Sequence, residues 1–105
     1  MRYLCCYVVR RALHAATAML AQALAPKLRV VGVAPGISLV SGDQTEAGFA
    51  KAHAATPLGR SSTPQDVAAA VCFVAASPAI TGTTLVVDGG QHLVPLQRDV
   101  MFLAK

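Results

Sequence analysis

Six residues of this chain carry thiol or imidazole groups that could act as nucleophiles or bind a transition metal: Cys5, Cys6, Cys72, His14, His53 and His92. Structural zinc sites need such ligands at short, recurrent spacings. The histidines lie far apart, and the neighbouring Cys5 and Cys6 cannot form an ordinary disulfide because their side chains diverge. The sequence therefore predicts no metal site, and the odd number of cysteines favours a reducing compartment, which we take to be the cytoplasm.

The phrase Asp88-Gly89-Gly90 is a second candidate, because a carboxylate next to glycines could bind a metal ion or a phosphate group. A single carboxylate beside a turn is a poor set of ligands. We therefore interpret this phrase as the chemistry of a tight turn, in which an aspartate side chain bonds to the backbone that follows it.

The charge pattern excludes one class of partner. Nine basic residues against five acidic ones give a net charge of +4. Nucleic-acid-binding proteins gather positive charge on one face and interleave it with stacking aromatic residues. Here the basic residues are scattered and aromatic residues make up 5% of the chain, so we predict no nucleic-acid partner. No stretch reaches the roughly 18 uninterrupted apolar residues of a membrane span, so we predict no membrane partner.

The N-terminal region imitates a secretory leader. Arg10-Arg11 precede an alanine-rich run that ends in Ala21-Gln22-Ala23, which has the form of a cleavage site. His14 and Thr17 interrupt the apolar run, and a true leader would carry its charges at its very start. These features weaken the resemblance to a leader, and a secreted protein with a cleaved leader stays open as an alternative to a cytoplasmic protein.

Residues 11–25 form the first element that could position a site. Leu13, Leu20 and Leu24 recur at helical spacing among strong helix formers, and Pro26 stops the pattern. The composition agrees with helices packed on a buried sheet, since 54% of the residues are hydrophobic and only 13% are charged. A chain of 105 residues has room for one modest core, so we predict a single domain.

Residues 28–34 and 83–87 are predicted strands, because both are rich in β-branched residues and apolar enough to be buried on both faces of a parallel sheet. Between them, residues 45–55 favour a short helix whose one large anchor is Phe49. A longer helix is predicted to follow Thr63, with Thr63 as its cap, Pro64 at its first position and Asp66 at its third. Three residues are expected to line its buried face: Val67, Val71 and Val74.

This order of helix, strand, helix and strand predicts an α/β fold, the C-terminal part of a doubly wound parallel sheet. Two parallel strands cannot form a stable sheet alone, because both faces need covering helices and each edge needs a neighbour. We therefore predict that residues 1–105 are a single partial domain. Either a missing N-terminal half completes the sheet or a partner does, and self-association is one form of such partnering.

Five phrases carry a family resemblance, and they occur in the order Val33-Ala34-Pro35-Gly36-Ile37, Thr56-Pro57-Leu58-Gly59-Arg60, Thr63-Pro64-Gln65-Asp66-Val67, Thr81-Gly82 and Val86-Val87-Asp88-Gly89-Gly90. Together they resemble the C-terminal half of the short-chain dehydrogenase/reductase family over roughly residues 10–93. The ending Gly89-Gly90-Gln91-His92-Leu93 is most similar to the pteridine-reductase-like branch. Residues 1–9 do not resemble the family.

The resemblance implies a Rossmann-type oxidoreductase that uses NADP or NAD on a small carbonyl or pterin-like substrate. In that family the nicotinamide cofactor lies across the carboxyl ends of the strands, and a glycine-rich loop after the first strand binds its phosphates. No set of glycines in this chain matches that loop. The resemblance therefore implies a C-terminal fragment that is inactive alone, and the choice between NAD and NADP is not encoded in it.

The family's catalytic Tyr-x-x-x-Lys pair should stand near the start of the first helix, where the tyrosine passes a proton to the carbonyl oxygen and the lysine lowers the pKa of the tyrosine. One register places Tyr7 and Arg11 at these positions, after a slip of one residue. The other places Cys6 and Arg10 there. Neither contains the lysine, and the planar guanidinium of arginine does not reproduce its compact ammonium group.

The family's nicotinamide contact is a better match. There a Pro-Gly turn after a strand bonds to the carboxamide through its backbone, which must come close and therefore needs glycine. Here that turn is Pro35-Gly36-Ile37. The usual threonine further along is Val40, for which Ser38 or Ser41 could substitute. An ordinary turn that ends a strand is the alternative, because Pro-Gly pairs mark turns generally.

A second class of function stays open. The chain could be a non-catalytic module in which helix 11–25 and the last strand form a subunit interface. The missing half favours this reading, whereas the ordered family phrases favour the enzyme.

Overall fold

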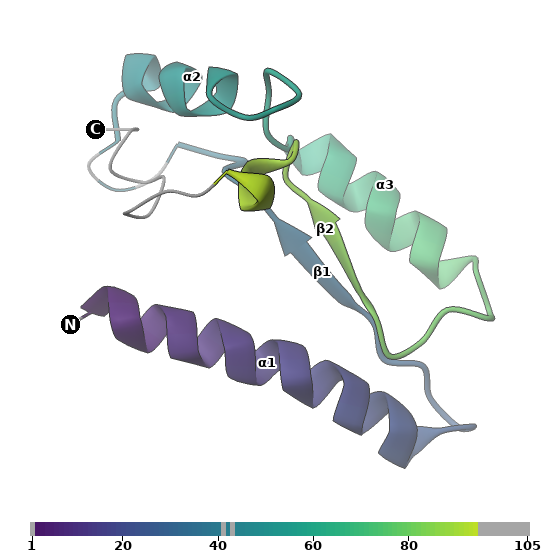
Figure 1. Cartoon of the computed structure of the whole chain (residues 1–105). Coiled ribbons are helices and arrows are strands. Elements are labelled where there is room, and N and C mark those ends of the chain that lie inside the picture. The colour runs from purple at the N-terminus through teal and green to yellow at the C-terminus, as the bar shows by residue number, and fades with distance from the viewer. Residues whose placement is uncertain (1, 41, 43, 95–105) are drawn as a thin grey trace. The chain divides into compact units, whose positions relative to one another are not determined.

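A computed structural model describes residues 2–40, 42 and 44–94, with side chains from residue 8 onward. Its elements, in chain order, are α1 (Arg2–Leu24), β1 (Gly32–Pro35), α2 (Glu46–Ala54), α3 (Pro64–Ala75), β2 (Thr84–Val87) and the short 3-10 helix η1 (Gln91–Leu93) (Figure 1). None of the described helices is long and apolar enough to cross a membrane.

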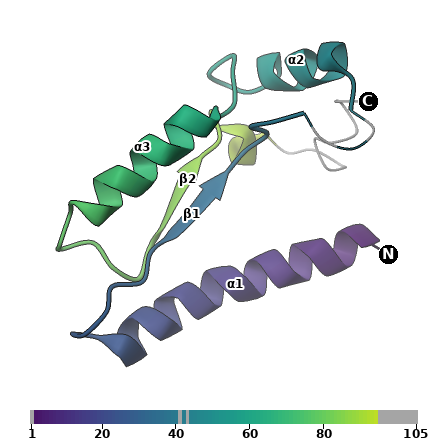
Figure 2. The ribbon, with the colours of Figure 1, turned by 180° about the vertical axis from the view of Figure 1, so that it is seen from behind.

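The two strands pair in parallel, as expected. β1 and β2 form a two-stranded sheet and lie side by side in both views (Figures 1 and 2). The backbone N–H of Gly32 donates to the carbonyl of Thr83 at 2.9 Å, and that of Gly36 donates to Val87 at 3.0 Å. The sequence offset is the same in both pairs, which is the register of a parallel ladder. Both strands therefore end at the same edge of the sheet.

The first strand is shorter than predicted. Residues 28–34 were expected to be extended throughout, but β1 begins at Gly32 and includes Pro35. Val30 bonds instead to the turn before β2: its N–H donates to Thr81 Oγ1 at 3.1 Å, and its carbonyl accepts from Gly82 N at 2.8 Å. The ladder between the two strands therefore does not reach Val30, because the segment beside it is a turn.

The first helix is longer than predicted. It begins at Arg2 rather than Arg11 and ends at Leu24, just before Ala25-Pro26. Residues 3–9 contain neither glycine nor proline, so nothing in them interrupts a helix that the alanine-rich part propagates.

The chain divides into two compact units. One comprises residues 1–33 and 70–85, and the other comprises residues 34–69 and 86–105. In the first unit, α1 turns a narrow buried face inward, where Thr17 and Ala21 are 8% and 4% exposed. The Thr17 hydroxyl donates to the carbonyl of Leu13 at 2.9 Å. Ala21 lies so close to Gly82 that a side chain built there would be 3.4 Å from the Ala21 methyl group.

Arg29 closes the C-terminal end of α3 in the same unit. Its Nη1 donates to the carbonyls of Val74, Ser77 and Ile80 at 3.0, 2.9 and 3.2 Å, and its Nη2 donates to that of Ala75 at 3.0 Å. The last carbonyls of a helix have no partner within the helix and carry partial negative charge. The Arg29 guanidinium donates hydrogen bonds to carbonyls at this end of α3, and its positive charge offsets their partial negative charge.

The second unit has a small apolar core of Ile37 and Ala52, against which Phe49 packs. Ile37 follows β1, whereas the other two lie on α2. The predicted short helix 45–55 is confirmed as α2, and Thr45 caps it by accepting the N–H of Gly48 at 3.0 Å. Phe49 is its large anchor, as the sequence indicated.

The predicted cap of α3 is confirmed in detail. The Thr63 hydroxyl accepts the N–H of Asp66 at 3.2 Å, and the Asp66 carboxylate accepts the N–H of Thr63 at 2.9 Å. This reciprocal pair is a capping box. The predicted apolar stripe is covered only in part, since Val74 is buried but Val71 is 50% exposed.

Candidate functional site

Two turns meet at the edge where both strands end. The turn 35–38 begins at the last residue of β1, and the turn 88–91 follows β2. Both turns belong to the second compact unit. In open α/β sheets, ligands bind at the carboxyl ends of the strands. This edge is therefore the candidate site, and each predicted cofactor residue can be placed on it.

Gly36 packs closely against other residues of this edge. Its N–H completes the sheet by donating to Val87. A Cβ atom there would collide with Ser61 Oγ, lie 2.8 Å from Asp88 Cβ and lie 2.9 Å from Gln91 Oε1. The need for glycine thus comes from segments that are remote in the sequence, not from a left-handed backbone conformation. The turn therefore packs closely against these neighbours.

The side chain of Ile37 belongs to the small apolar core, and its backbone N–H bonds to a side chain of the neighbouring turn. The side chain is 8% exposed. Its N–H donates to Gln91 Oε1 at 3.3 Å, near the long limit for such a bond. A ligand acceptor that approached this N–H would compete with a weak bond, and the amide of Gln91 would be released to turn elsewhere.

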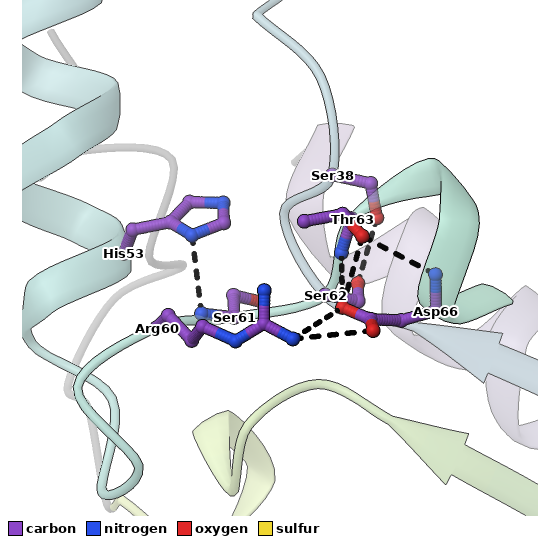
Figure 3. A network of polar contacts seen from close by, with 7 residues as sticks. All are labelled: Ser38, His53, Arg60, Ser61, Ser62, Thr63 and Asp66. Atoms are coloured by element: carbon purple, nitrogen blue, oxygen red, sulfur yellow. Dashed lines mark hydrogen bonds and ion pairs between the residues drawn. The ribbon is translucent and has the colours of Figure 1, made fainter.

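Ser38 links the turn to the segment before α3. Its hydroxyl donates to the Gly36 carbonyl at 3.1 Å, and it lies 2.7 Å from the hydroxyl of Ser62, which is 2% exposed (Figure 3). Pro35, at the end of β1, is exposed. Of the predicted threonine substitutes, Ser38 is thus engaged within the chain, and Ser41 lies outside the described residues.

The predicted catalytic residues lie on α1. Tyr7 and Arg11 are one helical turn apart, as are Cys6 and Arg10 in the other register. The side chains of Cys6 and Tyr7 lie outside the described part of the chain, whereas Arg10 and Arg11 are exposed. These residues belong to the first compact unit, and the turn that follows β1 belongs to the second.

His53 and Ser61 form a polar pair that sequence reasoning did not single out. His53 Nδ1 accepts the N–H of Ser61 at 3.1 Å (Figure 3). The remaining polar atoms of both side chains, His53 Nε2 and Ser61 Oγ, are buried and have no hydrogen-bond partner among the described residues. The ring of Phe49 lies 4.5 Å from that of His53. No local signal marks this pair, because only the fold brings the loop onto α2.

Asp88 forms the turn that the sequence predicted and also binds a histidine that it did not. Asp88 Oδ1 accepts the N–H of Gly90 at 2.9 Å, and Gly89 and Gly90 adopt positive φ angles of 64° and 86°. The carboxylate also accepts from the backbone N–H and the Nδ1 of His92, each at 2.9 Å. The spacing of four residues between Asp88 and His92 was the available signal.

Among the described residues, Asp66 has a clearly perturbed pKa. Its bonds from the backbone and the hydroxyl of Thr63 lower its pKa below the usual 3.8, and the positive charge of Arg60 at 2.9 Å adds to the effect. The cause is stabilisation of the carboxylate form by the helix cap. This residue therefore belongs to the structure of α3 and not to a proton-transfer site. No group of three or more metal-ligating side chains occurs in the described part of the chain.

Comparison with known proteins identifies the family. Residues 2–92 match the family model described as enoyl-(acyl carrier protein) reductase, so the match includes residues 2–9, which we did not expect to resemble the family. The chain is 44% identical over 94 residues to carbonyl reductase family member 4 of Danio rerio, covering 86% of this chain and 38% of that protein. It is 36% identical over 107 aligned residues to a 1,2-dihydroxy-1,2-dihydronaphthalene dehydrogenase of Ralstonia, covering 84% of this chain and 40% of that protein.

Solved structures agree. FolM alternative dihydrofolate reductase 1 from Brucella suis, in complex with NADP, matches with a TM-score of 0.79 and 37% identity, over 88% of this chain and 37% of that one. A small-chain dehydrogenase in complex with NADPH matches with a TM-score of 0.74 and 30% identity, over 83% of this chain and 42% of that one. The predicted α/β class is confirmed.

The chain belongs to the short-chain dehydrogenase/reductase family. It spans 28% to 40% of the lengths of the curated relatives that it matches.

Proposed function

We propose that this chain is the C-terminal part of an NADP- or NAD-dependent oxidoreductase that reduces a small carbonyl or pterin-like compound in the cytoplasm. The observation that carries the proposal is the closely packed turn 35–38 at the carboxyl ends of paired parallel strands. The Ile37 N–H and the exposed Pro35 would face the nicotinamide carboxamide, and Ser38 would hold the turn in place. The bound cofactor would supply the hydride.

By itself the chain should not catalyse the reaction, because its residues include neither a glycine-rich phosphate loop nor the Tyr-x-x-x-Lys pair. The family's proton donor and the cation beside it would have to be Tyr7 and Arg11. Arginine provides charge near a phenol but not the compact ammonium group. We therefore expect this chain to keep more of the family's ability to bind the nicotinamide end of the cofactor than of its ability to transfer a proton.

Two chimaeras separate these contributions. Both take their N-terminal part from the Brucella suis relative, and one joins this chain before Ala12 so that the relative keeps its own catalytic helix start. The other joins it before Arg2 and so carries Tyr7 and Arg11. We expect NADPH-dependent reduction of 7,8-dihydrobiopterin by the first and NADPH binding with little turnover by the second. A folded first chimaera that does not bind NADPH would refute the cofactor role of turn 35–38.

A subunit interface is the second candidate function, and the outer surface of α1 favours it. Val9, Leu13 and Leu20 are 65%, 68% and 49% exposed and share one side of the helix with Leu24. An apolar row of this kind is normally covered, and covering a leucine fully is worth about 1.5–3 kcal/mol. We propose that a second copy of the chain, or the family's missing half, covers it.

Sedimentation at several concentrations tests this interface. We expect the chain to associate, and Leu13→Glu together with Leu20→Glu to shift it toward the monomer. His14→Glu together with Gln22→Glu is the matched control, because both residues are exposed on the same helix and the pair adds the same two charges outside the row. A monomer with sharp cooperative unfolding would contradict the proposal.

A further inference from the structure

The Asp88 carboxylate binds the imidazole ring of His92 as well as the backbone of its own turn. Asp88 is 7% exposed, and its two oxygens accept from two backbone N–H groups and from His92 Nδ1, at 2.9–3.0 Å. The His92 side chain, by contrast, is 51% exposed. A buried carboxylate therefore holds an exposed ring by one of its two nitrogen atoms, as carboxylates do for histidines that bind metals or move protons.

This contact determines which nitrogen atom of His92 faces outward with a lone pair. An ionised carboxylate only accepts hydrogen bonds, so Nδ1 must carry the hydrogen. In the neutral ring Nε2 then has a free lone pair and acts as an acceptor. Neutral His92 thus presents a hydrogen-bond acceptor at the surface.

His53 provides the contrast within the same unit. Its Nδ1 accepts from Ser61 N, so its neutral ring carries the hydrogen on Nε2, and that atom is buried. His53 therefore faces inward and serves the packing of α2. Of these two histidines in the described part of the second unit, His92 is the one whose ring is exposed.

The position of His92 links this acceptor to the candidate site. Its neighbour Gln91 accepts the N–H of Ile37, and Asp88 lies against Gly36. We propose that His92 Nε2 accepts a hydrogen bond from an O–H or N–H group of the substrate, so that the preferred substrate is a donor-bearing polar ring compound rather than a plain carbonyl compound. This inference rests on the proposed function, because it requires a substrate at the carboxyl edge of the sheet.

Long-range proton–nitrogen NMR of the ¹⁵N-labelled chain tests both steps. We expect the resonances of neutral His92 to report a protonated Nδ1 and a lone pair on Nε2. Titration with 7,8-dihydrobiopterin, which has N–H and O–H donors, should shift Nε2 saturably, and acetophenone, which has none, should not. His14, exposed on α1, is the internal control. In His92→Phe the affinity for dihydrobiopterin should fall about two- to tenfold, the worth of one hydrogen bond.

A reversed tautomer, or no saturable shift at Nε2, overturns the inference; so does an equal shift at His14. The wild-type spectra decide this even if His92→Phe does not fold. A separate titration with NADPH, read at the amides of Gly36 and Ile37, tests the proposed function. If NADPH shifts those amides while dihydrobiopterin leaves His92 unchanged, the role of His92 is refuted and the cofactor proposal stands.

Discussion

Replacing Arg29 should loosen the end of α3 more than any other single charge removal on the surface of the first unit. Arg29→Met keeps the length of the side chain and removes the guanidinium, which leaves the carbonyls of Val74, Ala75, Ser77 and Ile80 without this donor. Water can replace the three exposed bonds at little cost. The bond to Val74 is partly buried, and a hydrogen bond to a charged group is worth about 1.5–3 kcal/mol.

Adding about 0.5 kcal/mol for a cation at a helix C-terminus, and taking the low end for the bond, gives about 2 kcal/mol for Arg29→Met. Urea denaturation followed by circular dichroism should then show a midpoint lower by about 1–2 M, given slopes of about 1–2 kcal/mol/M for small proteins. Arg29→Lys should recover only part of the loss, because one ammonium cannot reach all these carbonyls.

Arg10→Met is the matched control, since Arg10 is exposed on α1, and it should change stability by less than about 0.5 kcal/mol. Hydrogen exchange gives a local reading: the N–H groups of Ala76 and Ser77, which bond to Cys72 and Val74, should exchange faster in Arg29→Met. Equal midpoints and equal exchange in the Arg29 and Arg10 variants would refute the capping argument.

Three further predictions concern the second unit. Thr63→Ala should cost about 1 kcal/mol of unfolding free energy, whereas Thr83→Ala, at an exposed position, should cost little; equal midpoints would contradict the cap. Because the pKa of Asp66 is lowered in the folded state, its contribution is fully present above the usual 3.8 and is lost as pH falls through the lowered value. Stability measured from about pH 5 to pH 2 should therefore fall more steeply in the wild type than in Asp66→Asn. Gly36→Ala should cost about 1–3 kcal/mol because its methyl group would press on Ser61, Asp88 and Gln91, and an unchanged melting temperature would show that this edge yields easily.

The elements that the sequence predicted well are those whose signals are local. The cap at Thr63 and Asp66 involves residues three apart, and the helix that contains Phe49 is bounded by its own capping threonine. The errors lie where an element depends on a distant neighbour. β1 starts only at Gly32 because the segment beside Val30 is a turn. α1 extends to Arg2 because helix formation propagates through residues that no motif marks.

The candidate site divides in the same way. The sequence by itself determined the family, the parallel order of the strands and the Pro35-Gly36-Ile37 turn, since each follows from residue types at short spacings. Only the tertiary structure decided why Gly36 must be glycine and which nitrogen atom of His92 faces outward. The need for glycine at position 36 depends on where residues remote in the chain lie. The orientation of His92 depends on the direction of the Asp88 carboxylate. Packing at the shared edge of the two strands brings Ser61 and Gln91 against Gly36, and no local pattern encodes that contact.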